Sequence, residues 1–270
     1  MINLQQLYEI QKILKNMKYP DYKRVSKEIS DYVQDENQLQ KILREIKKHK
    51  PWEYIRGSIE FYALEFKINR NVLIPRIETE KLVSLGIQNF KDNKFDTVID
   101  VGTGSGCIII SFVKSLMLPS IYNGKIKNIE FIATDSDNKA LSVAKRNIKD
   151  HNLNEKISVH KADLISKLKL DDKNVLILAN LPYIPTAQYK KLDESVRIYE
   201  PKIALDGGKD GNKYYKKLAE QLSKSKLKRF TLILETEESI INETEKIFKK
   251  YNTQVIQDIQ EKDRFLIVES

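Results

Sequence analysis

The sequence predicts an α/β protein in which an open, mostly parallel sheet carries helices on both faces and follows a small helical module. Three observations support this fold class. Apolar strand-like runs alternate with helical patterns from residue 95 onward. A glycine-rich turn joins the first of those runs to a helix. The first 50 residues contain no glycine and repeat their apolar positions at helical spacing.

The composition fits a folded protein of one large domain, or of a main domain with a smaller one, because the chain has 270 residues and 41% hydrophobic residues. Its one cysteine, Cys107, excludes a disulfide framework and suits a reducing cytosol. The three histidines have no partners at metal-ligand spacing, so we expect no metal site.

The net charge of +9 raises the question of a nucleic-acid partner. Because the basic residues are spread along the chain and not gathered into an arm, we interpret them as a lysine-rich, solvated surface. We therefore expect no direct nucleic-acid binding. The N-terminus has no signal-peptide pattern, and no apolar run approaches the ~18 residues needed to span a bilayer. These features predict a cytoplasmic protein without membrane contact.

The N-terminal part predicts two or three helices, with Pro20 separating the first helix from a segment that begins near Tyr22. Residues 58–68 alternate in part, and the turn residues 69–71 precede a second apolar run, which indicates a β-hairpin. A helix then restarts over 78–90. We therefore expect a helical domain at residues 1–56, a β-hairpin linker at 57–76 and a main domain at 77–270.

The main domain alternates between strands and helices in the manner of a Rossmann-like fold. Strands are predicted at 97–101, 129–134, 156–160, 174–179, 230–235 and 264–268, and a short extended segment lies at 254–258. Helices are predicted at 105–117, 137–151, 211–225 and 238–251. Because only a short turn follows residue 258, the last strand can run antiparallel at the edge of the sheet.

The first strand leads into a turn of sequence DVGTGSG at residues 100–106. Its candidate cofactor-binding residues are Gly102, Thr103, Gly104, Ser105 and Gly106. The turn lacks the Gly-Lys-Ser/Thr end of a P-loop and the G-x-G-x-x-G spacing of a dinucleotide site. Asp100, at the mouth of the strand, disfavours a pyrophosphate and suits a cation. S-adenosylmethionine is cationic and lacks phosphate, so we interpret the turn as a binding site for this cofactor. The alternative is an ordinary tight turn that binds no ligand.

Three further residues are candidates for binding this cofactor. Asp135 ends the second strand, where a carboxylate can accept both ribose hydroxyls. A loop insertion at residues 118–128 explains its long separation from the glycine turn, and Asp137 is the rival residue, expected to cap the next helix. After the third strand, Asp163 can bind the adenine amine and Leu164 can cover a ring face, with a plain loop as the alternative.

The fourth strand ends in the sequence NLPY at residues 180–183, beside the expected cofactor crevice. The side-chain oxygen of Asn180 can accept one N–H of a planar NH2 group, and the carbonyl of Leu181 can accept the other. Pro182 stiffens the turn, and Tyr183 offers a face for stacking. These four residues are the candidate substrate site, with Asn180 and Tyr183 as catalytic residues, and Asn180 also borders the cofactor.

The NLPY turn resembles the Asn-Pro-Pro-Tyr motif of amino-methyltransferases, and the whole chain from about residue 50 resembles the HemK/PrmC family. Five segments agree in order, at residues 51–57, 74–80, 100–106, 180–183 and 200–211. The resemblance implies a seven-stranded class I methyltransferase fold and N5-methylation of the glutamine in the Gly-Gly-Gln motif of class I peptide chain release factors. It also implies that the N-terminal helical domain recognises the release factor.

Four departures from the family pattern are visible. Leu181 and Ile77 replace prolines, Leu164 stands where a tryptophan is common, and the glycine and glutamine expected after Glu235 are absent. The replacement of proline by Leu181 affects the rigidity of the NLPY turn more than its chemistry, because Leu181 acts through its backbone carbonyl. Leu164 weakens stacking on adenine. The roles of Arg76 and Glu78 stay open.

Three alternatives remain at this point. A nucleic-acid adenine N6-methyltransferase uses the same logic to hold its acceptor nitrogen. A ribosomal-protein glutamine methyltransferase is a rival within the family, although the sequence ETE at residues 78–80 is closer to the release-factor branch. A non-catalytic nucleotide-binding module would not need the residues of the NLPY turn.

Overall fold

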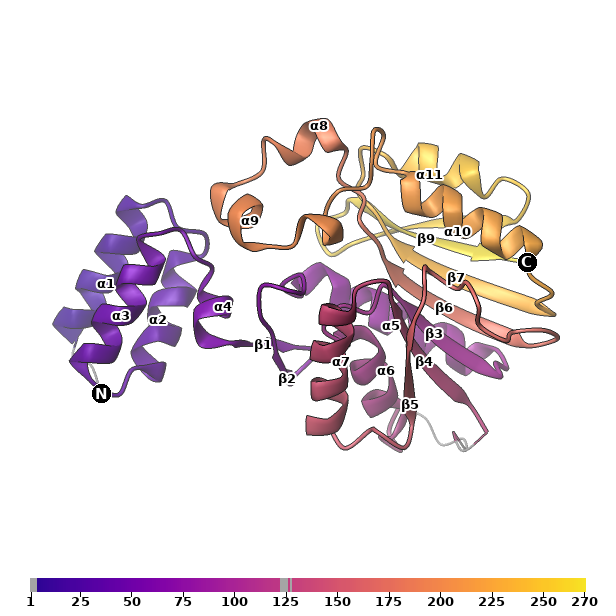
Figure 1. Cartoon of the computed structure of the whole chain (residues 1–270), viewed down its shortest axis with the longest axis horizontal. Coiled ribbons are helices and arrows are strands. Elements are labelled where there is room, and N and C mark those ends of the chain that lie inside the picture. The colour runs from indigo at the N-terminus through magenta and orange to yellow at the C-terminus, as the bar shows by residue number, and fades with distance from the viewer. Residues whose placement is uncertain (1–3, 122–125, 127) are drawn as a thin grey trace.

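The structure, a computed structural model, describes residues 4–121, 126 and 128–270. A group of N-terminal helices lies to one side of a large sheet, and a short hairpin connects the two (Figure 1). Residues 122–125 and 127 of the predicted insertion at 118–128 lie outside the described residues. No helix in the described ranges is long and apolar enough to cross a membrane.

The N-terminal helices are α1 (Leu4–Asn16), α2 (Tyr22–Tyr32), α3 (Glu36–Ile46) and α4 (Trp52–Arg56). They form because their apolar residues recur at helical spacing, and the Asp35 carboxylate caps α3 by accepting from the Gln38 N–H at 2.8 Å. Ile10, Ile29, Ile46 and the fully buried Trp52 share one core. The helices therefore pack around a core of their own.

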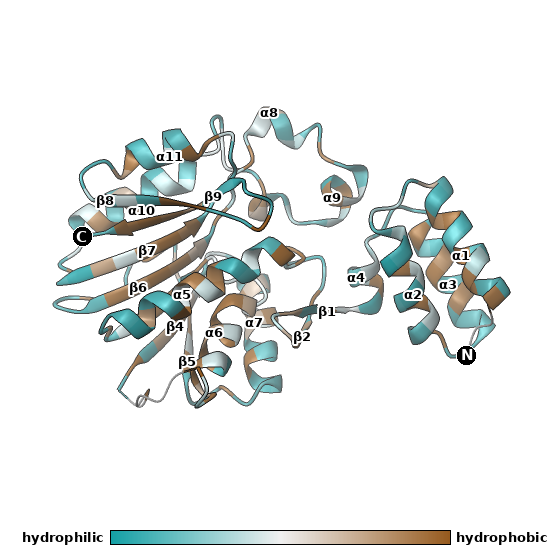
Figure 2. Ribbon diagram, turned by 180° about the vertical axis from the view of Figure 1, so that it is seen from behind, coloured by the Kyte–Doolittle hydropathy of each residue, from teal (hydrophilic) through white to brown (hydrophobic). Residues whose placement is uncertain are grey.

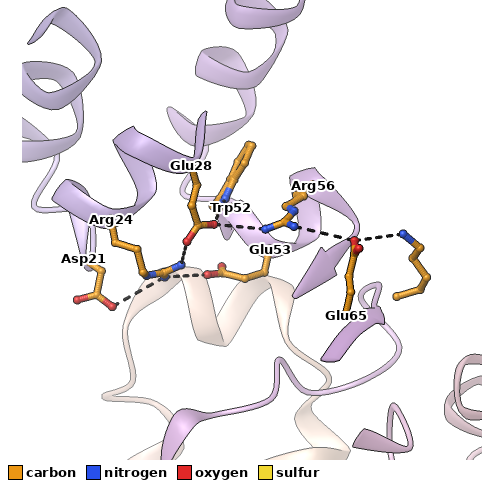
Figure 3. A network of polar contacts seen from close by, with 8 residues as sticks. Asp21, Arg24, Glu28, Trp52, Glu53, Arg56 and Glu65 are labelled. Carbon is orange, nitrogen blue, oxygen red and sulfur yellow. Dashed lines mark hydrogen bonds and ion pairs between the residues drawn. The ribbon is translucent and has the colours of Figure 1, made fainter. Parts of the chain in front are cut away.

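A chain of polar contacts runs from α2 through α4 to the hairpin (Figure 3). The Glu28 carboxylate accepts from the Trp52 indole at 2.8 Å, and Arg24 reaches both Glu28 at 2.7 Å and Glu53 at 3.0 Å. Arg56 continues the chain to Glu65 at 3.9 Å. Because most of these groups are partly exposed, they orient the helices more than they stabilise the fold.

The hairpin consists of β1 (Ser58–Phe61) and β2 (Leu64–Lys67), which pair antiparallel. The predicted turn at residues 69–71 forms, with the Val72 N–H donating to the Asn69 carbonyl at 3.1 Å, but it follows β2 and is not the hairpin turn. The chain reverses between the two strands at Tyr62 and Ala63. Both have left-handed backbone angles, with φ of 52° and 57°, as a two-residue hairpin turn requires. Neither residue is one of the glycines or asparagines that usually mark such a turn, so the sequence carried no local signal for it.

The sheet has seven strands in the order β5-β4-β3-β6-β7-β9-β8, and the first five of these are mutually parallel. They are β5 (Ile157–Lys161), β4 (Glu130–Asp135), β3 (Thr97–Val101), β6 (Asn174–Asn180) and β7 (Arg229–Glu235). Strands β6, β7 and β9 are largely hydrophobic (Figure 2), as expected for strands buried on both faces. The Rossmann-like prediction is confirmed.

Helices cover both faces of the sheet. One face packs against α5 (Glu80–Asp92), α6 (Cys107–Leu116) and α7 (Asn138–Asp150), and the other against α10 (Lys213–Lys224) and α11 (Ile241–Ile247). The short elements η1 (Ile77–Thr79), α8 (Thr186–Tyr189), α9 (Glu194–Tyr199) and η2 (Lys202–Ala204) form loops above the carboxyl ends of the strands. The sequence did not predict α8 and α9, which have no buried residues.

The last two strands are β8 (Asn252–Gln257) and β9 (Asp263–Glu269). The expected antiparallel direction of the last strand is confirmed, but its place at the edge was wrong, because β9 pairs with both β7 and β8. Four consecutive residues of β9 are buried, whereas exposed and partly buried residues make up β8. The more polar strand takes the edge because one side of an edge strand faces solvent.

Candidate active site

A cavity lies at the carboxyl ends of β3, β4 and β6. Its walls bring together five segments that are distant in the sequence, at residues 71–79, 102–108, 135–140, 162–164 and 180–182. The predicted residues in these walls are Gly102, Thr103, Gly104, Ser105, Asp135, Asp163, Leu164, Asn180, Leu181 and Pro182. Two predicted residues, Gly106 and Tyr183, are not among its lining residues.

The glycine turn needs its glycines, because Gly102, Gly104 and Gly106 have φ of 74°, 54° and 82°. Three of its N–H groups bond within the protein. Those of Gly102 and Thr103 donate to the Thr134 carbonyl at 2.9 and 2.8 Å, and that of Gly104 donates to Asp135 at 3.1 Å. Phosphate-binding loops offer such N–H groups to their ligand, so this turn suits a cofactor that lacks phosphate.

Asp100 lies beneath the glycine turn and is not a lining residue of the cavity, contrary to the expectation that its charge faces the ligand. The side chain is fully buried and accepts from the Thr103 hydroxyl at 2.6 Å and the Ile109 N–H at 3.4 Å. Burial raises the pKa of Asp100 to about 7. Asp100 therefore shapes the turn from below.

Asp135 occupies the cavity wall at the end of β4. Its two carboxylate oxygens accept from the N–H groups of Gly104 at 3.1 Å and Asp137 at 2.9 Å, and burial raises its pKa. Each oxygen keeps a second lone pair that can accept a hydroxyl of a bound ribose. Asp137 caps α7 by accepting from the Lys139 N–H at 2.9 Å, which confirms the expected cap.

The wall at residues 162–164 differs in detail from the expectation. The Asp163 carboxylate, expected to bind an adenine amine, forms an ion pair with Lys217 of α10. Leu164 is buried and presents an apolar surface. Tyr214 also lines the cavity, and the sequence reasoning missed it. The only available signal was an aromatic residue near the start of a predicted helix.

Asn180 ends β6 and turns its side chain toward η1. Its Nδ2 group donates to the Thr79 hydroxyl at 3.0 Å, and its strand neighbour in register is Glu235 of β7. Thr79 is buried and lines the same cavity, but the sequence reasoning did not single it out. The signal that could have found it is its place in the segment 74–80.

The glycine turn and the NLPY turn lie in close contact. A Cβ atom on Gly102 would lie 3.0 Å from a methyl group of Leu181, which is itself 3% exposed. Tyr183 is partly buried behind the cavity wall, and burial raises the pKa of its hydroxyl. A ligand on the glycine turn therefore lies next to the backbone at residues 180–182.

The segment 200–211 supports the NLPY turn from outside. The Ile184 N–H donates to the Leu205 carbonyl at 3.0 Å, and the Gly207 N–H donates to the Ile184 carbonyl at 2.8 Å. A Cβ atom on Gly207 would lie 2.7 Å from the Pro182 carbonyl oxygen. Only a glycine allows this close backbone approach.

Arg76 connects the segment 74–80 to the segment 200–211. Its guanidinium donates to the buried Glu200 carboxylate at 2.6 Å, and the second carboxylate oxygen accepts from the Ile74 N–H at 3.2 Å. Burial is the largest influence on the pKa of Arg76 and lowers it, but the nearby Glu200 raises it to a net value above the ordinary one. Arg76 therefore has a structural role, whatever else it contacts.

Solved structures with a similar fold include the hMettl16 catalytic domain in complex with MAT2A 3′UTR hairpin 6. It aligns with a TM-score of 0.54 at 17% identity and covers 77% of this chain and 75% of that chain. At this identity the likeness concerns the fold alone. Within the chain, residues 82–196 match the model of the methyltransferase small domain.

The sequence relatives are more similar. A release factor glutamine methyltransferase of Flavobacterium psychrophilum is 33% identical over 242 residues, which are 86% of this chain and 79% of the relative. One of Clostridium acetobutylicum is 34% identical over 207 residues, 75% of this chain and 69% of the relative. Identity over most of both lengths, together with a cavity that joins the glycine turn to the NLPY turn, shows that this chain belongs to the release factor glutamine methyltransferase family.

Proposed function

We propose that the protein transfers a methyl group from S-adenosylmethionine to the side-chain nitrogen (N5) of the glutamine in the Gly-Gly-Gln motif of class I peptide chain release factors. The observation that carries this proposal is the single cavity whose walls include both the glycine turn and the NLPY turn. A donor on one turn and an amide on the other are thereby held next to each other. The names of the sequence relatives supply the class of acceptor.

The residues of the cavity fit this cofactor. S-adenosylmethionine would supply a methyl group bonded to a positively charged sulfur. The amide nitrogen would attack the methyl carbon as the carbon–sulfur bond breaks, the sulfur would leave as a neutral thioether, and the nitrogen would lose one proton to solvent. The glycine turn offers a backbone whose Gly102, Thr103 and Gly104 N–H groups already bond within the protein. Asp135 offers acceptors for the ribose, and Leu164 offers an apolar wall for the adenine. Asp163 lines the same cavity and can bind the adenine amine when its ion pair with Lys217 opens.

Asn180 and Leu181 orient the acceptor. The Asn180 side-chain oxygen and the Leu181 carbonyl accept the two N–H groups of the glutamine amide, and Pro182 limits movement of the turn. An amide nitrogen is a weak nucleophile because its lone pair is delocalised, so fixed orientation supplies much of the rate enhancement. Tyr183 packs behind the turn as a support for it, which replaces the stacking face expected from the sequence.

A cleft between the N-terminal helices, the hairpin and the loop segments at residues 74–80 and 193–200 adjoins this cavity, and Pro75 and Arg76 line both. Three guanidinium groups line the cleft, those of Arg24, Arg56 and Arg76. Its eight carboxylate residues are Asp21, Glu28, Glu53, Glu60, Glu78, Glu80, Asp193 and Glu200. An acidic cleft in a protein of net charge +9 supports a protein acceptor and disfavours a phosphate backbone.

Recognition of the acceptor and methyl transfer are assigned to different parts of the chain by the same cleft. Residues 1–56 and the hairpin linker at 57–76 form one side of the cleft and recognise the release factor, and residues 77–270 carry the methyl transfer. The position of the linker between the two, with Asn147 of α7 bonded to both Lys67 and the Ser105 carbonyl, supports a fixed spacing between recognition and catalysis.

The test is a labelled-methyl assay with four acceptors, namely release factor, its Gln→Ala variant at Gly-Gly-Gln, ribosomal protein and DNA. We expect label on the first alone. Asn180→Ala should abolish transfer and leave the dissociation constant of S-adenosylmethionine nearly unchanged. Label on DNA and none on release factor would overturn the proposal, and full activity of Asn180→Ala would refute the role of Asn180.

A further inference from the structure

The orientation of the Asn180 amide decides whether it can hold an acceptor. Its two ends have opposite hydrogen-bonding character, because Oδ1 only accepts and Nδ2 only donates. The acceptor amide presents N–H groups, so Oδ1 must face the cavity and Nδ2 must face away from it. A rotation by 180° about the last side-chain bond would place two donors against the N–H groups of the substrate.

Thr79 accepts from the Nδ2 end of Asn180 at 3.0 Å. Its hydroxyl carries a single hydrogen, and the nearby Glu235 carboxyl, whose pKa the Thr79 hydroxyl lowers, can accept it. Thr79 and Glu235 are 2% and 1% exposed, so water does not provide alternative partners. The Asn180 and Glu235 backbones lie opposite each other in the parallel pair β6–β7, which brings all three side chains to one place.

We infer that Thr79 and Glu235 are positioning residues, which fix the Asn180 amide with its oxygen toward the acceptor. An ionised Glu235 can only accept, so the Thr79 hydrogen must point to it. The Thr79 oxygen can then only accept from Asn180, which determines the direction of the whole chain of hydrogen bonds. This inference rests on the proposed role of Asn180 in holding the acceptor.

The protonation state of Glu235 controls the direction of these hydrogen bonds. Burial is the largest influence on the pKa of Glu235 and raises it, to a net value of about 7. The nearby Glu78 also raises this pKa, whereas the Thr79 hydroxyl, Arg264 and Arg76 lower it. The Tyr183 hydroxyl, whose pKa burial raises, lies near enough to Glu235 for its charge to raise that pKa further, and the Tyr215 hydroxyl donates to the Glu235 backbone carbonyl at 2.7 Å. A protonated Glu235 can donate to Thr79, and the Thr79 hydrogen is then free to turn toward Asn180. Transfer should therefore slow as the pH falls through the pKa of Glu235.

The test compares Thr79→Val, which keeps the shape and loses the hydroxyl, with Thr79→Ser, which keeps the hydroxyl. Thr97→Val is the matched control, because Thr97 is a fully buried threonine at the far end of β3 whose hydroxyl has no hydrogen-bond partner within the described ranges. Each variant is assayed as the full chain for kcat, for KM of donor and of release factor, and for melting temperature.

We expect Thr79→Val to lower kcat by about 10- to 100-fold with little change in the KM of the donor, as for a misoriented group. Thr79→Ser and Thr97→Val should keep nearly the wild-type kcat. Glu235→Gln should lower kcat, because its amide can donate to Thr79, and should remove the loss of activity in acid that the wild type shows. All four variants should fold, with melting temperatures close to that of the wild type.

Several results would overturn the inference. Thr79→Val with the kcat of the wild type would show that the hydroxyl does not orient Asn180. Equal losses in Thr79→Val and Thr79→Ser, or a similar loss in Thr97→Val, would show that packing and not the hydrogen bond matters. A wild-type protein that labels no release factor would instead overturn the proposed function, on which the inference depends.

Discussion

Gly207 provides the sharpest test of how the loop at residues 200–211 supports the acceptor site. It packs directly against the backbone of the NLPY turn. A Cβ atom there would lie 2.6 Å from the Gly211 carbonyl oxygen, 2.7 Å from the Pro182 carbonyl oxygen and 2.8 Å from the Tyr183 carbonyl carbon. All three are backbone atoms, which cannot turn aside as the end of a side chain can. Gly207→Ala must therefore move the turn or the loop.

The size of the movement follows from these distances. Ordinary contact of a Cβ atom begins at 3.4 Å, so relief of the contact with the Pro182 oxygen requires a displacement of about 0.7 Å. A misplacement of ~1 Å in a site that works by orientation lowers the rate by about 100-fold. We therefore expect Gly207→Ala to lower kcat by about 10- to 100-fold, or ~1.4 to 2.7 kcal/mol in activation free energy.

The assay measures initial rates of labelled-methyl transfer to release factor, with donor affinity measured separately by calorimetry. Gly86→Ala is the control, because its added Cβ would lie 2.9 Å from a terminal methyl of Leu178, which can rotate away. Donor affinity should stay unchanged in both variants, because Gly207 lines no part of the cavity. A Gly207→Ala variant with wild-type kcat, or one that loses donor affinity to the same extent as kcat, would refute this reasoning.

Two further predictions concern buried charge. The pKa of Asp100 in the folded protein lies near 7, above its ordinary value of 3.8. The protonated carboxyl therefore stabilises the fold in acid, and this contribution to the free energy of unfolding is lost as the pH rises from 3.8 to about 7. The melting temperature should therefore fall more in the wild type than in Asp100→Asn between about pH 5 and about pH 8, and parallel curves would contradict this. Arg76→Ala should lower the free energy of unfolding by about 3 kcal/mol in urea denaturation, because Glu200 stays buried without its partner. Adding Glu200→Gln should recover part of the loss, and an unchanged midpoint in Arg76→Ala would refute the pairing.

Much of the fold could be predicted because its signals are local. Buried parallel strands produce apolar runs, and tight strand-to-helix turns require glycine, so the five parallel strands and the turn at residues 100–106 stand out in the sequence. The NLPY turn could be placed beside the cofactor because the carboxyl ends of parallel strands meet at one edge. The hairpin turn at Tyr62 could not, since its residues lack the usual turn chemistry.

The sequence by itself determined the class of sheet, the two turns at its active edge and the family. Only the tertiary structure decided which neighbours complete those turns. Thr79, Asn180 and Glu235 lie far apart along the chain, and Gly207 meets Pro182 through backbone contacts that no local pattern encodes. Asp100 shows the same limit, because its position at a strand end was visible, whereas the direction of its side chain depends on what packs above it. Such contacts arise from the packing of distant segments, so they are settled only when the chain has folded.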